Sequence, residues 1–131
     1  MKGREGAGLL AAALRQLQGT LWLAMGRTEE AHAALRQTIE EVRQRPGPDE
    51  WIQATFTLES IARASRDAND WAFAAWVAQQ MIEHDPNYAG AHYAAALVAE
   101  HNRDEQTARR EFAAARRFWA HGDPDVLKLV P

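Results

Sequence analysis

Histidine is the residue type in this chain best suited to metal binding or proton transfer. A zinc site needs three or four converging ligands, and two ligands share a helix face when they lie three or four residues apart. No two histidines have that spacing, and the chain contains no cysteine. We therefore predict no metal site and ordinary surface or packing roles for the five histidines. They are His32, His84, His92, His101 and His121.

Sequence motifs of catalysis are missing as well. The chain has no P-loop, no dinucleotide-binding GxGxxG, no HExxH and no GxSxG. Ser60 and Ser65 have no base at a predictable range, and the acidic residues are scattered along the chain. We predict a protein that is not an enzyme and binds no cofactor.

Several arginines lie near the end of the chain, and two adjacent pairs of them are seven residues apart. A row of this kind can bind an acidic partner or nucleic acid. Glu111 and Asp104 interrupt it, and the net charge of the whole chain is −3. We favour a solvated face and expect no nucleic-acid partner. The row consists of Arg103, Arg109, Arg110, Arg116 and Arg117.

Tryptophan is frequent, with five in 131 residues. Trp22 and Trp71 fall on core-type positions, so packing accounts for them. Trp51 and Trp76 are the candidates for exposed anchors, because aromatic residues dominate binding hot spots. Packing is the alternative role for both.

Composition indicates one soluble domain, with 47% hydrophobic and 25% charged residues. The longest weakly polar run, residues 6–14, is about half of the roughly 20 residues that cross a membrane. No secretory cleavage pattern follows it. We expect a cytoplasmic protein without membrane contact.

Helices must position all of these residues, since Ala, Leu, Gln, Glu and Arg dominate and have high helix propensity. A period organises the helices. Small residues recur at Gly19, Ala62 and Ala96, and each is followed twelve positions later by an alanine, at Ala31, Ala74 and Ala108. A small residue is needed where two helices cross closely. Glycine, asparagine or charged residues occupy the turn between them at 26–27, 69–70 and 103–104.

The first two repeats are offset by 43 residues and the next two by 34. We place the nine extra residues between Gln37 and Trp51, as added turns on the second helix of repeat one followed by an exposed connection. Asp49 would cap the next helix, with Trp51 in its first turn. Asp85-Pro86 would end one helix and start another, since proline suits a first turn.

This pattern resembles the tetratricopeptide repeat, a helix–turn–helix of 34 residues, in its bacterial type. Segment 69–87 is the best match and segment 85–115 is nearly as good, whereas Arg15 and Gln18 depart from the large apolar residues of the family. The resemblance implies an all-α fold, a right-handed superhelical stack of antiparallel pairs with about six helices. Repeats would span about 8–47, 50–85 and 86–120 of a single domain, with a tail at 121–131.

In this family the first helix of each pair lines a concave groove that binds protein or peptide. The resemblance places Ala13, Gln16, Thr20 and Leu23 there in repeat one, Phe56, Glu59, Arg63 and Arg66 in repeat two, and Tyr93, Leu97, Glu100 and His101 in repeat three. Co-chaperones of the family hold a peptide carboxylate with Lys, Asn and Arg. Only Arg63 could serve here, and Glu59 would repel an acidic terminus, so we expect no binding of chaperone C-terminal peptides.

The resemblance implies a non-catalytic interaction module, a scaffold or adaptor for an unidentified protein or peptide. Two alternatives remain open: self-association through uncapped ends of the helical stack, and a regulatory domain of a larger protein. Apolar residues 126–130 of the tail would either cap the last repeat or dock on another molecule. Light scattering against concentration separates self-association from the leading interpretation.

Overall fold

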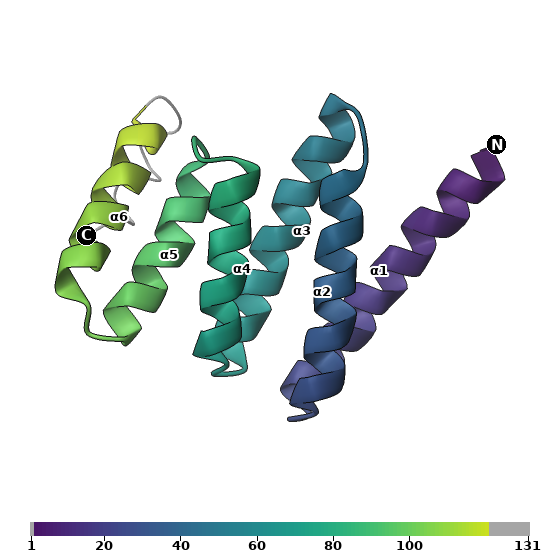
Figure 1. Cartoon of the computed structure of the whole chain (residues 1–131), viewed down its shortest axis with the longest axis horizontal. Helices are drawn as coiled ribbons and strands as arrows, with labels where there is room; N and C mark the ends of the chain where they lie inside the picture. Colours follow the sequence, from purple (N-terminus) through teal and green to yellow (C-terminus); the bar gives the residue numbers. More distant parts are fainter. Residues whose placement is uncertain (1, 121–131) are drawn as a thin grey trace. The chain divides into compact units, whose positions relative to one another are not determined.

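Six helices and no strand make up the part of the chain that the structure, a computed structural model, describes (Figure 1). Placement is described for the backbone of residues 2–120 and for the side chains of residues 8–120. The predicted all-α class and its six helices are confirmed. They are α1 (Lys2–Ala24), α2 (Thr28–Gln44), α3 (Pro48–Asp67), α4 (Trp71–His84), α5 (Ala89–His101) and α6 (Glu105–Trp119).

The chain divides into two compact units, Met1–Asp70 and Trp71–Pro131. The first unit holds α1, α2 and α3, and the second holds α4, α5 and α6. The division falls at the turn before Trp71, inside the segment predicted as repeat two. Each unit is therefore described by itself below.

In the first unit α1 packs along α2, and α2 along α3 (Figure 1). Gly19 lies where α1 meets α2: a β-carbon on it would sit 2.7 Å from Cγ of Leu35 and 3.4 Å from the β-carbon of Ala34. The missing side chain thus lets the two helices approach, as the small-residue pattern predicts. Leu35, Ile39 and Leu58 are fully buried in the same unit.

The second unit has its core between α5 and α6. Ala96, Ala99, Ala108 and Phe112 form one buried cluster there. Ala96 and Ala108, predicted to face each other, belong to the same cluster. Small side chains on both helices again allow close packing, and burial of alanine and phenylalanine supplies the hydrophobic stabilisation.

A single turn geometry recurs three times. Gly26, Asn69 and Arg103 have positive φ of 80°, 61° and 60° and lie two residues after the ends of α1, α3 and α5. The N–H of the next residue reaches back five positions in each case: Arg27 to Trp22 at 2.8 Å, Asp70 to Ser65 at 2.8 Å, and Asp104 to Ala99 at 2.9 Å. This is the Schellman helix end. Its spacing of 43 and then 34 residues matches the offsets of the sequence repeat.

The extra residues of the first offset are placed only in part as predicted, since α2 continues to Gln44 before the connection but the connection is shorter. The end of α4 corresponds to residue 41 when the offset of 43 is subtracted, and α2 ends three residues later, at Gln44. The start of α5 corresponds to residue 55 when the offset of 34 is subtracted, and α3 begins seven residues earlier, at Pro48. Most of the lengthening thus belongs to α3. Proline at the first helical position lets α3 start early, because its missing N–H needs no partner there.

Two predicted helix starts are also wrong. Gly47, at φ 101°, is the N-cap of α3, so Asp49 lies inside the first turn and not at the cap. Pro86 lies in the connection before α5, which begins at Ala89 with Tyr88 as N-cap. There the N–H of Asn87 donates to Oδ1 of Asp85 at 3.0 Å, so the connection closes as a side-chain-stabilised turn.

The predicted tail at 121–131, together with His121, lies outside the described residues. Within residues 2–120, none of the helices combines the length and the apolar character that crossing a membrane requires.

Candidate functional site

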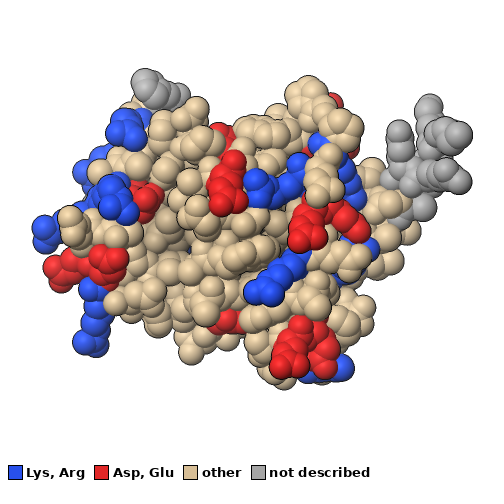
Figure 2. All heavy atoms as spheres, viewed as in Figure 1, with Lys and Arg blue, Asp and Glu red and all other residues tan. Residues whose placement is uncertain are grey.

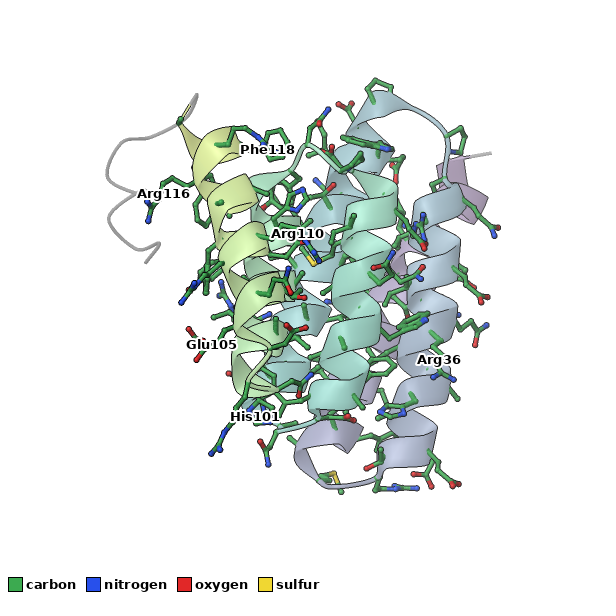
Figure 3. All side chains as sticks on the ribbon, turned by 60° about the vertical axis from the view of Figure 1, so that its left-hand side comes forward. Arg36, His101, Glu105, Arg110, Arg116 and Phe118 are labelled. Carbon is green, nitrogen blue, oxygen red and sulfur yellow. The ribbon has the colours of Figure 1, made fainter. Side chains whose placement is uncertain are left out.

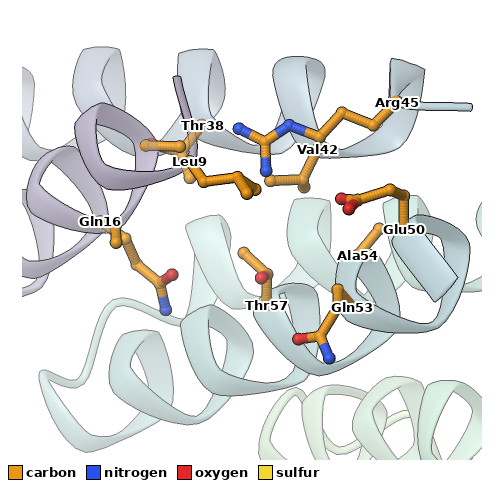
Figure 4. Close-up of a pocket in the computed structure, with 11 residues that line it drawn as sticks. Leu9, Gln16, Thr38, Val42, Arg45, Glu50, Gln53, Ala54 and Thr57 are labelled. Carbon is orange, nitrogen blue, oxygen red and sulfur yellow. The ribbon is translucent and has the colours of Figure 1, made fainter. Parts of the chain in front are cut away.

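A hollow of about 360 Å³ opens in the first unit where α1, α2 and α3 meet (Figure 4). Volumes near this value are at the lower end for ligand sites. Its floor is apolar and its rim carries amides, hydroxyls and one charge of each sign. The lining residues are Leu9, Ala12, Ala13, Gln16, Thr38, Val42, Arg45, Glu50, Gln53, Ala54 and Thr57.

Two long hydrogen bonds hold residues of the polar rim. Nε2 of Gln16 donates to Oγ of Ser60 at a long 3.4 Å, and Nη2 of Arg45 donates to the carbonyl of Gly8 at 3.4 Å. Hydrogen bonds of that length are weak. Thr38, by contrast, is buried and donates to the carbonyl of Ala34 at 3.0 Å. The amide of Gln16 and the guanidinium of Arg45 can therefore turn toward a ligand at little cost.

A second hollow, of about 290 Å³, lies further along the same two helices, α1 and α3. Thr20 and Ala24 line it from α1, and Ala64, Asp67 and the C-cap residue Ala68 line it from the end of α3. The two hollows together contain Ala13, Gln16 and Thr20, three of the residues predicted to line a groove. The structure thus brings this part of the predicted set to one α1–α3 surface of the first unit.

The other predicted groove residues of the first unit differ in exposure. Leu23 is only 6% exposed, so it is a core residue rather than a groove residue. Phe56 is 54% exposed and Arg63 is also exposed, whereas Glu59 and Arg66 are half-buried.

In the second unit, most of the residues predicted to line the groove pack against other side chains. Tyr93 and Leu97 lie against the α5–α6 core cluster, with the Tyr93 ring 6.1 Å from Phe112 and 5.5 Å from Trp119. His101 stacks on Trp71 at 4.1 Å and nearly parallel, while Glu100 is exposed. The rings of Tyr93 and His101 therefore have aromatic partners within their own unit.

The arginines of α6 project into solvent beside acidic residues. Arg109 lies 4.0 Å from Glu105, with both side chains more than four-fifths exposed, and Arg110 lies 3.7 Å from Glu111. Positive and negative side chains alternate over this helix in Figure 2, and Glu105 and Arg116 extend away from it in Figure 3. This mixture has the composition of a solvated face.

Two histidines make contacts that the sequence pattern did not reveal. Nδ1 of His92 lies 2.7 Å from Oε2 of Glu111, and its Nε2 lies 2.6 Å from the carbonyl oxygen of Pro86. Nε2 of His32 lies 2.5 Å from Oδ2 of Asp70. Each histidine thus links its own helix to another segment of the same unit. No group of three potential metal ligands occurs among the described residues.

The described tryptophans are at least partly engaged. The guanidinium of Arg27 lies 5.4 Å from the Trp22 ring, and Trp76 stacks on Phe73 at 5.5 Å. Trp51 remains 41% exposed beside Ile52, at a shallow apolar hollow that Gly47 and Pro48 complete. Of the two predicted exposed anchors, Trp51 is exposed and Trp76 is half-buried.

Asp104 is the N-cap of α6 and carries a perturbed carboxyl. Hydrogen bonds from the hydroxyl and then the N–H of Thr107 hold the pKa of this carboxyl below the ordinary value. Attraction to Arg110 acts in the same direction and partial desolvation opposes it.

No protein-family model, curated protein or solved structure matches the chain.

Proposed function

We propose that this chain is a non-catalytic interaction module of the tetratricopeptide type, which binds a protein or peptide through the α1–α3 surface of its first unit. Three features support the repeat assignment. The Schellman turns at Gly26, Asn69 and Arg103 follow the sequence offsets, Gly19 permits the α1–α2 approach, and alanines fill the α5–α6 core.

The observation that carries the binding proposal is the pair of hollows along α1 and α3. They lie end to end on one surface, and three residues predicted for a groove line them. The larger hollow can accept one or two side chains of a peptide. Gln16, Gln53 and Thr57 offer donors and acceptors to its backbone, and the apolar floor offers contact area.

Charge indicates the chemistry of the partner. Arg45 and Glu50 line one hollow and Asp67 lines the other, so the surface has no excess of positive charge. A strongly acidic segment or a free C-terminal carboxylate would find few cationic partners here. We propose a partner segment that is apolar or of mixed charge.

Capture from a lysate of the source cell, with variants matched in chemistry, tests this proposal. Gln53→Arg places a long charged side chain in the larger hollow, whereas Gln37→Arg makes the same change on an exposed part of α2 that lines no described hollow. We expect wild type and Gln37→Arg to enrich the same protein and Gln53→Arg to lose it. The captured protein is then purified, and calorimetry measures its affinity for the three chains.

Equal affinity of a captured protein for wild type and Gln53→Arg would remove the α1–α3 surface from the proposal. Enrichment of no protein over Gln53→Arg would contradict the binding function at this site.

A further inference from the structure

A row of exposed leucines runs along α1. This leucine stripe consists of Leu10, Leu14, Leu17 and Leu21, which are between 56% and 68% exposed. Steps of four, three and four residues keep their side chains on one face of a helix. Ala12 and Gly19, which are buried, are on the opposite face. α1 is therefore apolar both toward its own core and away from it.

The stretch of α1 that carries the leucine stripe holds a single charged residue, and that residue is paired. From Leu9 to Met25 the only charged residue is Arg15, and its Nη1 lies 2.7 Å from Oε2 of Glu41 on α2. The exposed face of α2 differs, since Glu29, Glu30, Arg36 and Glu40 are all on it. A surface helix normally has such a charged face, and a helix that is apolar all round is normally buried.

The exposed apolar area is large for one helix. With Met25, which extends the leucine stripe at 60% exposure, the side chains expose on the order of 500 Å², in the upper part of the range for the largest patch on a monomer. A stable interface buries about 800 Å² on each partner, and homodimer interfaces have more apolar centres than others. The leucine stripe supplies most of such a centre.

We propose that the leucine stripe is the interface at which a second copy of this chain binds, with two α1 helices packed against each other across a twofold axis. The alternation of four and three residues is the spacing of a heptad seam, which buries itself against a like helix. A twofold interface needs one patch that is complementary to itself, and a charge-free leucine row meets that condition.

Small, uncharged neighbours favour this occupant over another protein. Ala11, Ala13, Gln18 and Ala24 flank the leucine stripe and are exposed. They allow two helix axes to come within about 8–10 Å. They also leave no like charges to repel an identical partner and no charge pattern to select a different one. None of the four leucines lines either α1–α3 hollow, although Ala13 and Ala24 beside them line one hollow each. The leucine stripe therefore adjoins the proposed peptide site but shares no leucine with it.

Sedimentation equilibrium of the full chain tests the proposal. Wild type is expected at twice its 14.7 kDa mass at about 100 µM. The pair Leu14→Glu and Leu17→Glu places charge on both sides of the interface and should raise the dissociation constant at least about tenfold. The control pair Ala33→Glu and Gln37→Glu, on exposed positions of α2, should leave the dimer unchanged. Circular dichroism checks that the helices remain.

Cysteine cross-linking gives a second readout that needs no destabilising charge. The chain has no cysteine, so one introduced thiol reports only on its own position. Leu17→Cys, near the centre of the leucine stripe, should form a disulfide-linked dimer on mild oxidation, and Gln37→Cys should not. Self-cross-linking of Leu10→Cys as well would indicate parallel helices, and its absence would indicate antiparallel ones.

A monomeric wild type at about 100 µM would overturn the proposal, as would a dimer that the glutamate pair leaves intact. Equal cross-linking of Leu17→Cys and Gln37→Cys would overturn it as well. A monomer that captures another protein through the leucine stripe would show a different occupant. Failure of the dimer leaves the calorimetric test of the α1–α3 surface unaffected, because that test changes other side chains.

Discussion

Gly19 and Leu35 are in contact so close that a β-carbon on Gly19 would lie 2.7 Å from Cγ of Leu35. Leu35 is fully buried, so the side chain cannot simply swing into solvent. The close packing of α1 on α2 thus requires a residue without a β-carbon at position 19. Gly8, also in α1, is a matched reference, because a β-carbon added there would meet nothing within 4 Å.

Gly19→Ala is expected to destabilise the first unit. Overpacking against Leu35 costs about 1–3 kcal/mol, and the better helix propensity of alanine returns about 0.5–1 kcal/mol. The net loss should be about 1 kcal/mol, measured by urea unfolding with tryptophan fluorescence. Gly8→Ala should stabilise by up to about 1 kcal/mol, because propensity acts there without a clash. Equal effects of the two variants would contradict the close approach.

The recurrent turns predict a second set of stability changes. Arg103 has φ 60°, a conformation that favours glycine, so Arg103→Gly should raise stability by about 0.5–1 kcal/mol. Gly26→Ala should lower it by about 1 kcal/mol through the backbone alone, since its β-carbon would meet nothing within 4 Å. Asn69→Gly should change little, because asparagine tolerates this conformation. Thermal unfolding of the three variants measures whether their stabilities follow this order.

These turns also explain what the sequence could predict. Gly26 and Asn69 are residue types that favour the left-handed conformation, and the alanines mark helix crossings, so both are local signals in the residue order. The start of α3 is different. Gly47-Pro48 is as good a helix start as Asp49, and a choice between them depends on how α3 packs on α2.

The surfaces were predictable in part. Gln16 and Thr20 line the α1–α3 hollows, and their contact with a partner stays a prediction. Leu23 is buried, because a shift of one helical position separates a groove from a core. The spacing of Leu10, Leu14, Leu17 and Leu21 was a visible heptad signal. Leucines at this spacing indicate burial but do not identify the surface that covers them, so the sequence alone did not predict an interface here. The contacts of His92 join segments 6 and 19 residues away, and no local pattern specifies them.

A thermodynamic coupling between His92 and Glu111 is the third prediction. Both side chains are more than four-fifths buried, and their atoms Nδ1 and Oε2 are 2.7 Å apart. A double-mutant cycle with His92→Ala and Glu111→Ala should give a coupling of about 1–2 kcal/mol in the free energy of unfolding. The exposed pair Arg109 and Glu105 should give only about 0–0.5 kcal/mol. A coupling of similar size in both cycles would contradict a structural role of the His92 contact.

Asp104 gives the fourth prediction, a dependence of stability on pH. Its pKa is lowered on folding, chiefly by the hydroxyl and N–H of Thr107. A lowered pKa means that the unfolded chain binds the proton more tightly. The stabilisation is therefore complete above the ordinary value of 3.8 and is lost as the pH falls through the lower, folded value.

Asp104→Asn keeps an oxygen acceptor at the cap but removes the charge and this titration. The melting temperature of wild type should exceed that of Asp104→Asn at neutral pH, and the difference should shrink as the pH is lowered from about 7 to about 2. Thr107→Val removes the hydroxyl, which is the larger cause of the lowered pKa, and should reduce this pH dependence while the N–H bond keeps part of it. A wild-type advantage that grows on acidification would contradict the sign of the shift, because it would require a carboxyl that holds its proton more tightly in the folded chain.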